Sequence, residues 1–188
     1  MMNIKLPFVP KRPEKIRESG ITMVMDKGIS LKETENLIDA SAEFIDFVKF
    51  GFGTSLLCTQ LPEKICAYKN AGIRPYFGGT LFEAFVIRDM FKEYLRYLDT
   101  CEITTVEVSD GSMFMPHDKK CEYIYELSKN FYVISEVGSK DASVNFSKEE
   151  WKNMMQKELD AGAKKVIAEA RESGNVGIYK STGSADED

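Results

Sequence analysis

Tyr-Val-Ile-Ser-Glu-Val-Gly-Ser-Lys-Asp, residues 132–141, is the stretch from which the fold is most readily deduced. It opens with a short apolar run, which predicts a buried strand. Glu136 lies inside that run, and Lys140 and Asp141 follow the glycine that ends it. Charged residues rarely occur in a strand buried on both faces unless they are paired or have a function. Four other strand-like runs carry charge in the same way, so we expect one site where parallel strands end.

Strand-like runs alternate with helical segments six times along the chain. The predicted strands are 21–25, 47–50, 74–77, 104–108, the run that starts at Tyr132, and 165–170. Capping boxes at Ser30–Glu33, Thr80–Glu83 and Ser147–Glu150 predict three helix starts, and the second of these helices is expected to run to about Leu98. This alternation predicts an α/β fold with a parallel sheet and crossover helices.

Two arrangements of such a sheet are compatible with the pattern, an open doubly wound sheet and a closed barrel. An open doubly wound sheet often has a glycine-rich first turn, but the first turn here, Asp26-Lys27-Gly28, is not GxGxxG. Charge at the end of nearly every strand favours a (β/α)8 TIM-type barrel, whose site spans all the strand ends. About six of its β/α units are present in the chain. We expect an N-terminal arm at 1–19, an incomplete barrel domain at 20–178 and an acidic polar tail at 179–188.

Composition excludes several classes of function. The 188 residues carry a net charge of −5, which argues against a nucleic-acid surface. No apolar run approaches the length of a membrane span, and the first twelve residues lack the apolar core of a signal peptide. Four widely spaced cysteines and one histidine make a zinc site improbable. Reduced thiols are typical of the cytoplasm, which is the location we expect.

The charged strand residues have a functional interpretation and a structural one. Lys49 lies in a strand whose outer face should be covered by helices, so its ammonium should point into the barrel mouth toward an anion or a carboxylate. Glu107, Glu136 and Glu169 should face the same mouth, where clustered carboxylates suit Mg²⁺. The alternative is that these carboxylates form structural ion pairs with Lys27, Lys49 and Arg171.

Other residues near strand ends are candidates for binding an anion. Lys27 and Arg171 could hold phosphate or carboxylate, or could be ordinary surface charges. Gly78 and Gly79 precede a helix and could cradle an anion on backbone N–H groups, or form only a tight turn. A lysine after the fifth strand could act as a general acid. Two residues are expected to have no function: Glu83 as the capping partner of Thr80, and His117 as a solvated side chain.

Seven motifs follow one another in an order that resembles a known family. They are Thr22-Met-Val-Met-Asp-Lys-Gly28, Asp46-Phe-Val-Lys-Phe-Gly-Phe-Gly-Thr-Ser55, Gly78-Gly-Thr-Leu-Phe-Glu83, Glu107-Val-Ser-Asp-Gly111, Ser135-Glu-Val-Gly-Ser-Lys140, Asp160-Ala-Gly-Ala163 and Glu169-Ala-Arg-Glu-Ser-Gly174. The family is phosphosulfolactate synthase. The resemblance implies a (β/α)8 barrel that adds sulfite to phosphoenolpyruvate with Mg²⁺, giving (2R)-phospho-3-sulfolactate for coenzyme M or sulfolactate.

The resemblance also implies roles for individual residues. The family's proposed proton donor falls on Lys140. Lys27, Lys49 and Arg171 would hold the phosphate, carboxylate and sulfite groups. We place the Mg²⁺ ligands among four carboxylates by their position: Asp26, Glu107, Glu136 and Glu169.

The sequence departs from the family after Gly174, where a sixth helix and then the seventh and eighth strands with their helices would follow. Two hypotheses therefore remain: a synthase, or a non-catalytic truncated barrel that binds anions or is a homologue of a heat-stress-associated branch of the family. Because six strands leave two open sheet edges, we also expect a homo-oligomer.

Overall fold

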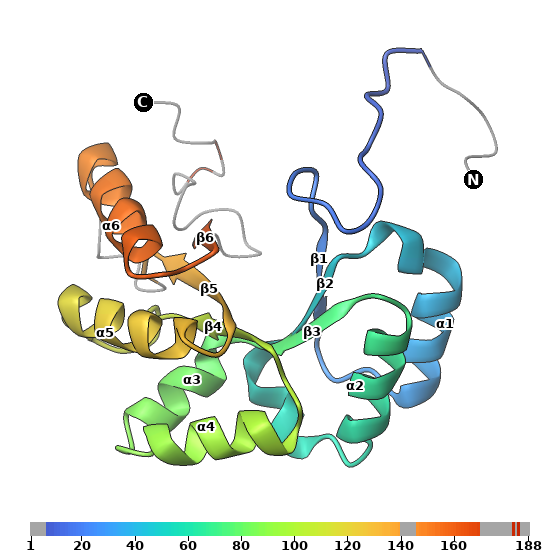
Figure 1. Ribbon diagram of the computed structural model, residues 1–188, viewed down its shortest axis with the longest axis horizontal. Coiled ribbons are helices and arrows are strands. Elements are labelled where there is room, and N and C mark those ends of the chain that lie inside the picture. The colour runs from blue at the N-terminus through green and yellow to red at the C-terminus, as the bar shows by residue number, and fades with distance from the viewer. Residues whose placement is uncertain (1–6, 140–145, 170–181, 183, 185–188) are drawn as a thin grey trace.

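The computed structural model describes residues 7–139, 146–169, 182 and 184. Six parallel strands form one sheet in which every strand pairs with its neighbours in chain order. Figure 1 shows the helices following one another around the outside of the curved sheet. The strands are β1 (Met23–Asp26), β2 (Phe47–Phe50), β3 (Arg74–Phe77), β4 (Thr105–Val108), β5 (Tyr132–Val137) and β6 (Lys165–Ala168).

The strand order distinguishes between the two predicted arrangements, a doubly wound sheet and a barrel. A doubly wound sheet reverses direction at a switch point, whereas this sheet runs β1-β2-β3-β4-β5-β6 without reversal. Uninterrupted sequential order is the topology of a (β/α) barrel. The prediction of an α/β, TIM-barrel-type fold with six units is therefore confirmed. The helices are α1 (Leu31–Ser41), α2 (Leu61–Asn70), α3 (Gly79–Val86), α4 (Phe91–Thr100), α5 (His117–Ser128) and α6 (Lys148–Asp160), with short 3₁₀ turns at Ala42–Phe44 (η1) and Gly51–Leu57 (η2).

Two of the three predicted capping boxes are present. Ser30 caps α1 and Ser147 caps α6, each by accepting a backbone N–H, while Glu33 and Glu150 reach back to the cap residues. Such caps satisfy N–H groups that have no partner within the helix. These two helices therefore begin where the local sequence predicts.

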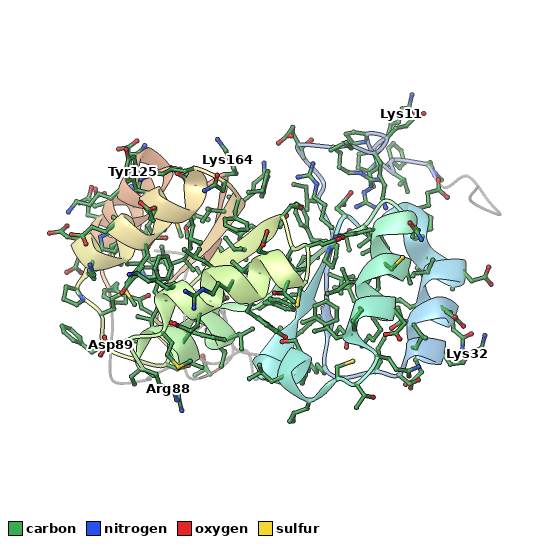
Figure 2. All side chains as sticks on the ribbon, turned by 60° about the horizontal axis from the view of Figure 1, so that its bottom comes forward. Lys11, Lys32, Arg88, Asp89, Tyr125 and Lys164 are labelled. Carbon is green, nitrogen blue, oxygen red and sulfur yellow. The ribbon has the colours of Figure 1, made fainter. Side chains whose placement is uncertain are left out.

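The predicted helix from Thr80 to about Leu98 is wrong in two respects. It is two helices, α3 and α4, separated by a turn in which Asp89 adopts a left-handed conformation with φ 53°; Figure 2 shows Arg88 and Asp89 at this turn. Its cap is Gly78, and Glu83 does not return to Thr80. Instead the buried Glu83 carboxylate accepts hydrogen bonds from Ser109 Oγ and Ser112 N. Tertiary partners on the β4–α5 loop outweigh the local capping pattern.

The two faces of the sheet have different environments. Val48, Phe50, Phe77, Val106 and Val133 face the helices and form the main hydrophobic core with them. The alternate residues face the inside of the curve, where Phe47, Tyr76 and Ile134 form a second, smaller cluster. Because successive side chains in a strand point to opposite faces, Lys49, Glu107 and Glu136 share this inner face.

The N-terminal arm packs against the ends at which the strands begin. Arg12 donates to Thr22 Oγ1 and to Asp46 Oδ2, at 2.8 and 3.1 Å. At the other side of the sheet, Glu18 forms a 3.1 Å ion pair with Lys165, the first residue of β6. The arm therefore links both outer parts of the sheet. Among the described residues, no helix combines the length and apolarity needed to cross a bilayer.

The two outer strands of the described sheet each pair on one side only, β1 with β2 and β6 with β5. Unpaired N–H and C=O groups on an exposed edge are a template for association with another chain. We expect a polypeptide of these 188 residues, expressed alone, to self-associate along these edges. Size-exclusion chromatography with light scattering measures this. A monomer that unfolds sharply at high temperature would show that these strand edges do not drive association.

Candidate active site

Lys49 lies between two carboxylates on the inner face of the sheet. Its Nζ is 2.6 Å from Glu107 Oε1 and 3.3 Å from Glu136 Oε2, so β2 is joined to β4 and β5. All three residues are buried, and Glu107 is fully so. We call Lys49, Glu107 and Glu136 the inner cluster. The structure therefore brings together three of the residues that the sequence placed in one site.

Burial and charge act in opposite directions within the inner cluster. Burial alone would lower the pKa of Lys49, but the charges of Glu107 and Glu136 raise it above its ordinary value overall. Burial raises the pKa of Glu107, while Lys49 and the Gly79 N–H partly offset this effect. Lys49 is therefore a permanently cationic group in a site that contains buried carboxylates.

Gly78 and Gly79 allow the start of α3 to approach the inner cluster closely. The Gly79 N–H donates to Glu107 Oε1 at 2.6 Å. A Cβ at Gly79 would overlap Ser109 Oγ and lie 3.1 Å from Glu107 Oε1, and one at Gly78 would lie 2.8 Å from Lys49 Cε. The two glycines thus supply space for the cluster, and the Gly79 N–H contacts a protein carboxylate.

Asp26 lies apart from the inner cluster. Its register partner is Phe50, so its side chain points to the helix-covered face of the sheet. There it forms a 2.6 Å ion pair with the buried Lys64 and accepts from the backbone N–H groups of Gly28 and Ile29. Asp26, a predicted metal ligand, therefore lies on the opposite face of the sheet from Glu107 and Glu136.

The other predicted site residues are distributed around the strand ends. Lys27 follows β1, with its ammonium 5.8 Å from the centre of the Phe52 ring. Glu169 follows β6, is buried, and donates its N–H to Val137 O at 2.8 Å, so it lies beside the end of β5. Lys140 and Arg171, the predicted proton donor and one predicted anion ligand, lie outside the described residues.

Comparison with known proteins identifies the family of this chain. A model of the family described as (2R)-phospho-3-sulfolactate synthase (ComA) matches residues 10–188. The chain belongs to this family. It is 44% identical over 177 residues to phosphosulfolactate synthase of Bacillus subtilis strain 168, covering 93% of this chain and 70% of that protein. It is 37% identical over 187 residues to phosphosulfolactate synthase of Methanothermobacter thermautotrophicus, covering 96% of this chain and 72% of that protein.

Two further similarities complete the comparison. Phosphosulfolactate synthase of Methanocaldococcus jannaschii is 37% identical over 176 residues, which cover 90% of this chain and 70% of that enzyme. Among solved structures, 3-hexulose-6-phosphate synthase aligns with a TM-score of 0.48 and 16% identity, covering 81% of this chain and 67% of that one. The named sequence relatives are all enzymes, so this chain is a member of an enzyme family.

The sequence analysis missed several residues that lie near the inner cluster of this member of the phosphosulfolactate synthase family. The Tyr76 hydroxyl is buried on the inner face, and burial together with the charges of Glu107 and Glu136 raises its pKa well above the ordinary value. Alternation along β3 could have placed Tyr76 on the same face as Lys49. Glu83 and Ser109 support the β4–α5 loop, but no local pattern reveals their contact, because they are 26 residues apart.

His117 is not the solvated residue that we expected. Its Nε2 lies 3.1 Å from Glu158 Oε1 of α6, and only 21% of its side chain is exposed. Glu158 is fully buried and needs polar partners, and His117 at the start of α5 is within reach. The position after a helix-starting proline did not reveal this contact, because the partner lies 41 residues away.

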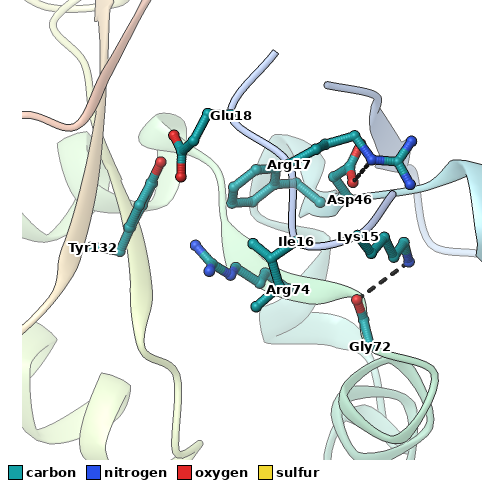
Figure 3. A pocket seen from close by; sticks show the side chains of 9 residues that line it. Lys15, Ile16, Arg17, Glu18, Asp46, Gly72, Arg74 and Tyr132 are labelled. Carbon is teal, nitrogen blue, oxygen red and sulfur yellow. Dashed lines mark hydrogen bonds and ion pairs between the residues drawn. The ribbon is translucent and has the colours of Figure 1, made fainter. Parts of the chain in front are cut away.

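A separate hollow opens at the opposite end of the sheet (Figure 3). It measures about 370 Å³, including the open space at its mouth, and its lining includes Lys15, Ile16 and Arg17 of the arm. Arg74 and Tyr132, the first residues of β3 and β5, also line it. Sites of barrel enzymes lie at the carboxyl ends of the strands. The inner cluster fits this rule, and the hollow does not.

Two carboxylates of the inner cluster, Glu107 and Glu136, would be available to a magnesium ion. Within the described ranges, no group of three or more histidine, cysteine or acidic residues forms a ready-made metal site. However, Mg²⁺ commonly binds through one or two carboxylates, with water and substrate supplying the other oxygens. Glu107 Oε2 is buried and has no hydrogen-bond partner in the described structure. Glu136 supplies a second carboxylate on the same face.

Proposed function

We propose that this chain is a synthase that adds sulfite to phosphoenolpyruvate and forms (2R)-phospho-3-sulfolactate. The observation that carries the proposal is the buried inner cluster at the carboxyl ends of β2, β4 and β5, in a chain that belongs to the phosphosulfolactate synthase family. Both proposed substrates are anions, and the protein has a net charge of −5. Fixed cations at the site are therefore needed to concentrate them.

The cations have separate roles in this proposal. Lys49 contacts carboxylates from two strands, so it offsets part of their negative charge where the substrate would bind. Lys27 at the end of β1 and Arg171 after β6 would hold the remaining phosphate, carboxylate or sulfite oxygens. The N-terminus of α3 at Gly78 and Gly79 borders the same space, with the Gly79 N–H held on Glu107.

The proposed reaction adds sulfite and a proton across a double bond, so a carbon–sulfur bond and a carbon–hydrogen bond replace the carbon–carbon π bond. The sulfur lone pair of sulfite attacks the methylene carbon of phosphoenolpyruvate, and a carbon–sulfur bond forms. The electron pair of the double bond moves to the neighbouring carbon, which carries the phosphate and carboxylate groups, and is delocalised into the carboxylate. Lys140 then donates a proton to that carbon from one face, which fixes its configuration.

We further propose that Glu107 and Glu136 hold Mg²⁺. Glu169, which follows β6, lies beside the end of β5 and is a further proposed ligand. Asp26 is the weakest of the four predicted ligands, because its carboxylate is paired with Lys64 on the other face of the sheet. When bound, the ion would supply positive charge where negative charge develops on the substrate carboxylate.

A direct assay tests the reaction. Purified protein mixed with phosphoenolpyruvate, sulfite and Mg²⁺ is expected to convert the phosphoenolpyruvate signal in the ³¹P NMR spectrum into that of a new phosphate ester. Omitting sulfite should stop the conversion, since the new carbon–sulfur bond requires it. Binding of phosphoenolpyruvate without any new phosphorus signal, under every metal condition, would favour the non-catalytic alternative.

We also propose a cytoplasmic location and a homo-oligomeric state. The four cysteines, all within the described ranges, form no disulfide, as is usual in a reducing compartment. The outer edges of β1 and β6, which pair with no other described strand, would support association between copies.

A further inference from the structure

Lys120 of α5 forms a buried polar network on the side of β5 that faces away from the inner cluster. Its Nζ donates to the backbone carbonyl of Glu136 at 2.6 Å. It also lies 2.9 Å from Asp110 Oδ1 and 2.8 Å from Glu158 Oε1. Both Lys120 and Glu158 are at most 1% exposed. All three N–H groups of the ammonium therefore have an oxygen partner.

The charge of Lys120 is fixed by its partners. Burial alone would lower its pKa, but the carboxylates of Glu158 and Asp110 raise it overall. The pKa of Glu158 is lowered because hydrogen bonds and charge from His117 and Lys120 outweigh its burial. Buried pairs of this kind often contribute little net stability compared with apolar residues of similar size. Stability alone is therefore a weak explanation for this network.

The partners of Lys120 connect the helix layer to two strand ends. Asp110 lies in the loop that follows β4, two residues after Val108, and Glu136 is the penultimate residue of β5. Lys120 holds the main chain of Glu136, while Lys49 contacts the side chain of the same residue from the other face. Two lysines thus fix Glu136 from opposite sides.

We infer that Lys120 is a positioning residue for the proposed reaction, because it fixes the backbone from which the Glu136 carboxylate reaches the inner cluster. The inference rests on the proposed function. Glu136 is four residues before Lys140, so the same contact also fixes the strand end that leads to the proposed proton donor. Lys120 itself is buried in the helix layer, and its contact with the inner cluster is to the main-chain carbonyl of Glu136, not to a side chain.

Two variants separate positioning from stability. Lys120→Met combined with Glu158→Met removes both buried charges, which favours retention of the fold, and leaves the Glu136 carbonyl without its donor. Glu158→Gln is the matched control, because the amide oxygen can still accept from Lys120 and the contact to the carbonyl is retained. Steady-state kinetics with phosphoenolpyruvate and sulfite, corrected for the folded fraction, give kcat and KM for each variant.

The double variant is expected to lose about 100-fold in kcat, the effect of a displacement of about 1 Å in a catalytic group, with a much smaller change in KM. Glu158→Gln should keep a kcat close to that of the unsubstituted chain. Equal kcat values in the two variants would overturn the inference. Absence of turnover in the unsubstituted chain would instead contradict the proposed function.

A second measurement does not depend on activity. Amide hydrogen exchange at residues 136–139 should be faster in the double variant than in Glu158→Gln, because the end of β5 has lost its anchor. Equal exchange in the two proteins would overturn the positioning role whether or not the chain turns over substrate.

Discussion

Replacing Lys49 with Met is expected to abolish sulfite addition and to lower the free energy of unfolding by about 3–5 kcal/mol, the usual cost of removing one partner from a buried ion pair. Glu107 Oε1 would lose its 2.6 Å cationic partner and Glu136 would lose its 3.3 Å contact. Chemical denaturation measures the stability, and the ³¹P NMR assay measures the activity.

The stability lost in Lys49→Met should depend on pH. Burial raises the pKa of Glu107, and Lys49 partly offsets this, so without Lys49 the folded-state pKa rises further. The unfolded carboxyl titrates near 4.5. A group with a raised folded pKa stabilises the protein when protonated, and this contribution is lost as pH rises through the folded value. The cost of the substitution should therefore be smaller in acid than at neutral pH.

A double variant separates the loss of activity from the loss of stability. Lys49→Met with Glu107→Gln removes the cation and also the more deeply buried of the two carboxylates left without it, so it should recover part of the stability without recovering activity. Substantial turnover in the double variant would show that Lys49 acts only as a structural counter-ion, which is the alternative that the sequence left open.

The second large effect is expected for Lys140→Ala. Turnover should fall about 10²–10⁴-fold, the usual contribution of a general acid, while binding of phosphoenolpyruvate changes little. Removing the proposed donor would leave no positioned proton for the carbanionic carbon, whereas the proposed anion ligands Lys27, Lys49 and Arg171 would be unchanged. Rapid-mix kinetics and calorimetric titration measure the two quantities.

A surface lysine provides the control for Lys140. Lys152 of α6 is 69% exposed and pairs only with Glu149 in the described structure, so Lys152→Ala should retain full turnover. Near-normal turnover in Lys140→Ala would remove Lys140 from the role of proton donor. Loss of phosphoenolpyruvate binding in that variant would reassign it to substrate binding.

Much of the architecture could be predicted from local patterns. The Ser30 and Ser147 capping boxes marked helix starts correctly, because a cap is satisfied within four residues. The strand at residues 74–77 was predicted to the residue. The capping box expected at Thr80 failed because Glu83 binds Ser109, a partner contributed by the next β/α unit.

Some residues of the site were predicted correctly and others were not, again because their partners lie far away in the sequence. Charge inside a buried strand pointed to Lys49, Glu107 and Glu136, and alternation placed them on one face. Asp26 carries the same signal at a strand end but faces the helices, where it pairs with Lys64. Whether a strand-end residue points inward depends on the strand's exact register, which the sequence pattern leaves uncertain by one residue.

The sequence alone determined the fold class, the family and the set of charged residues from which a site can be built, because periodicity and motif order are local properties of the chain. Tertiary structure alone decided which charges are partners. It paired Lys49 with Glu107 and Glu136 across 58 and 87 residues, separated Asp26 from them, and placed Lys120 behind Glu136. Ion pairs form between groups that are close in space, and only the completed sheet and its helices fix those distances.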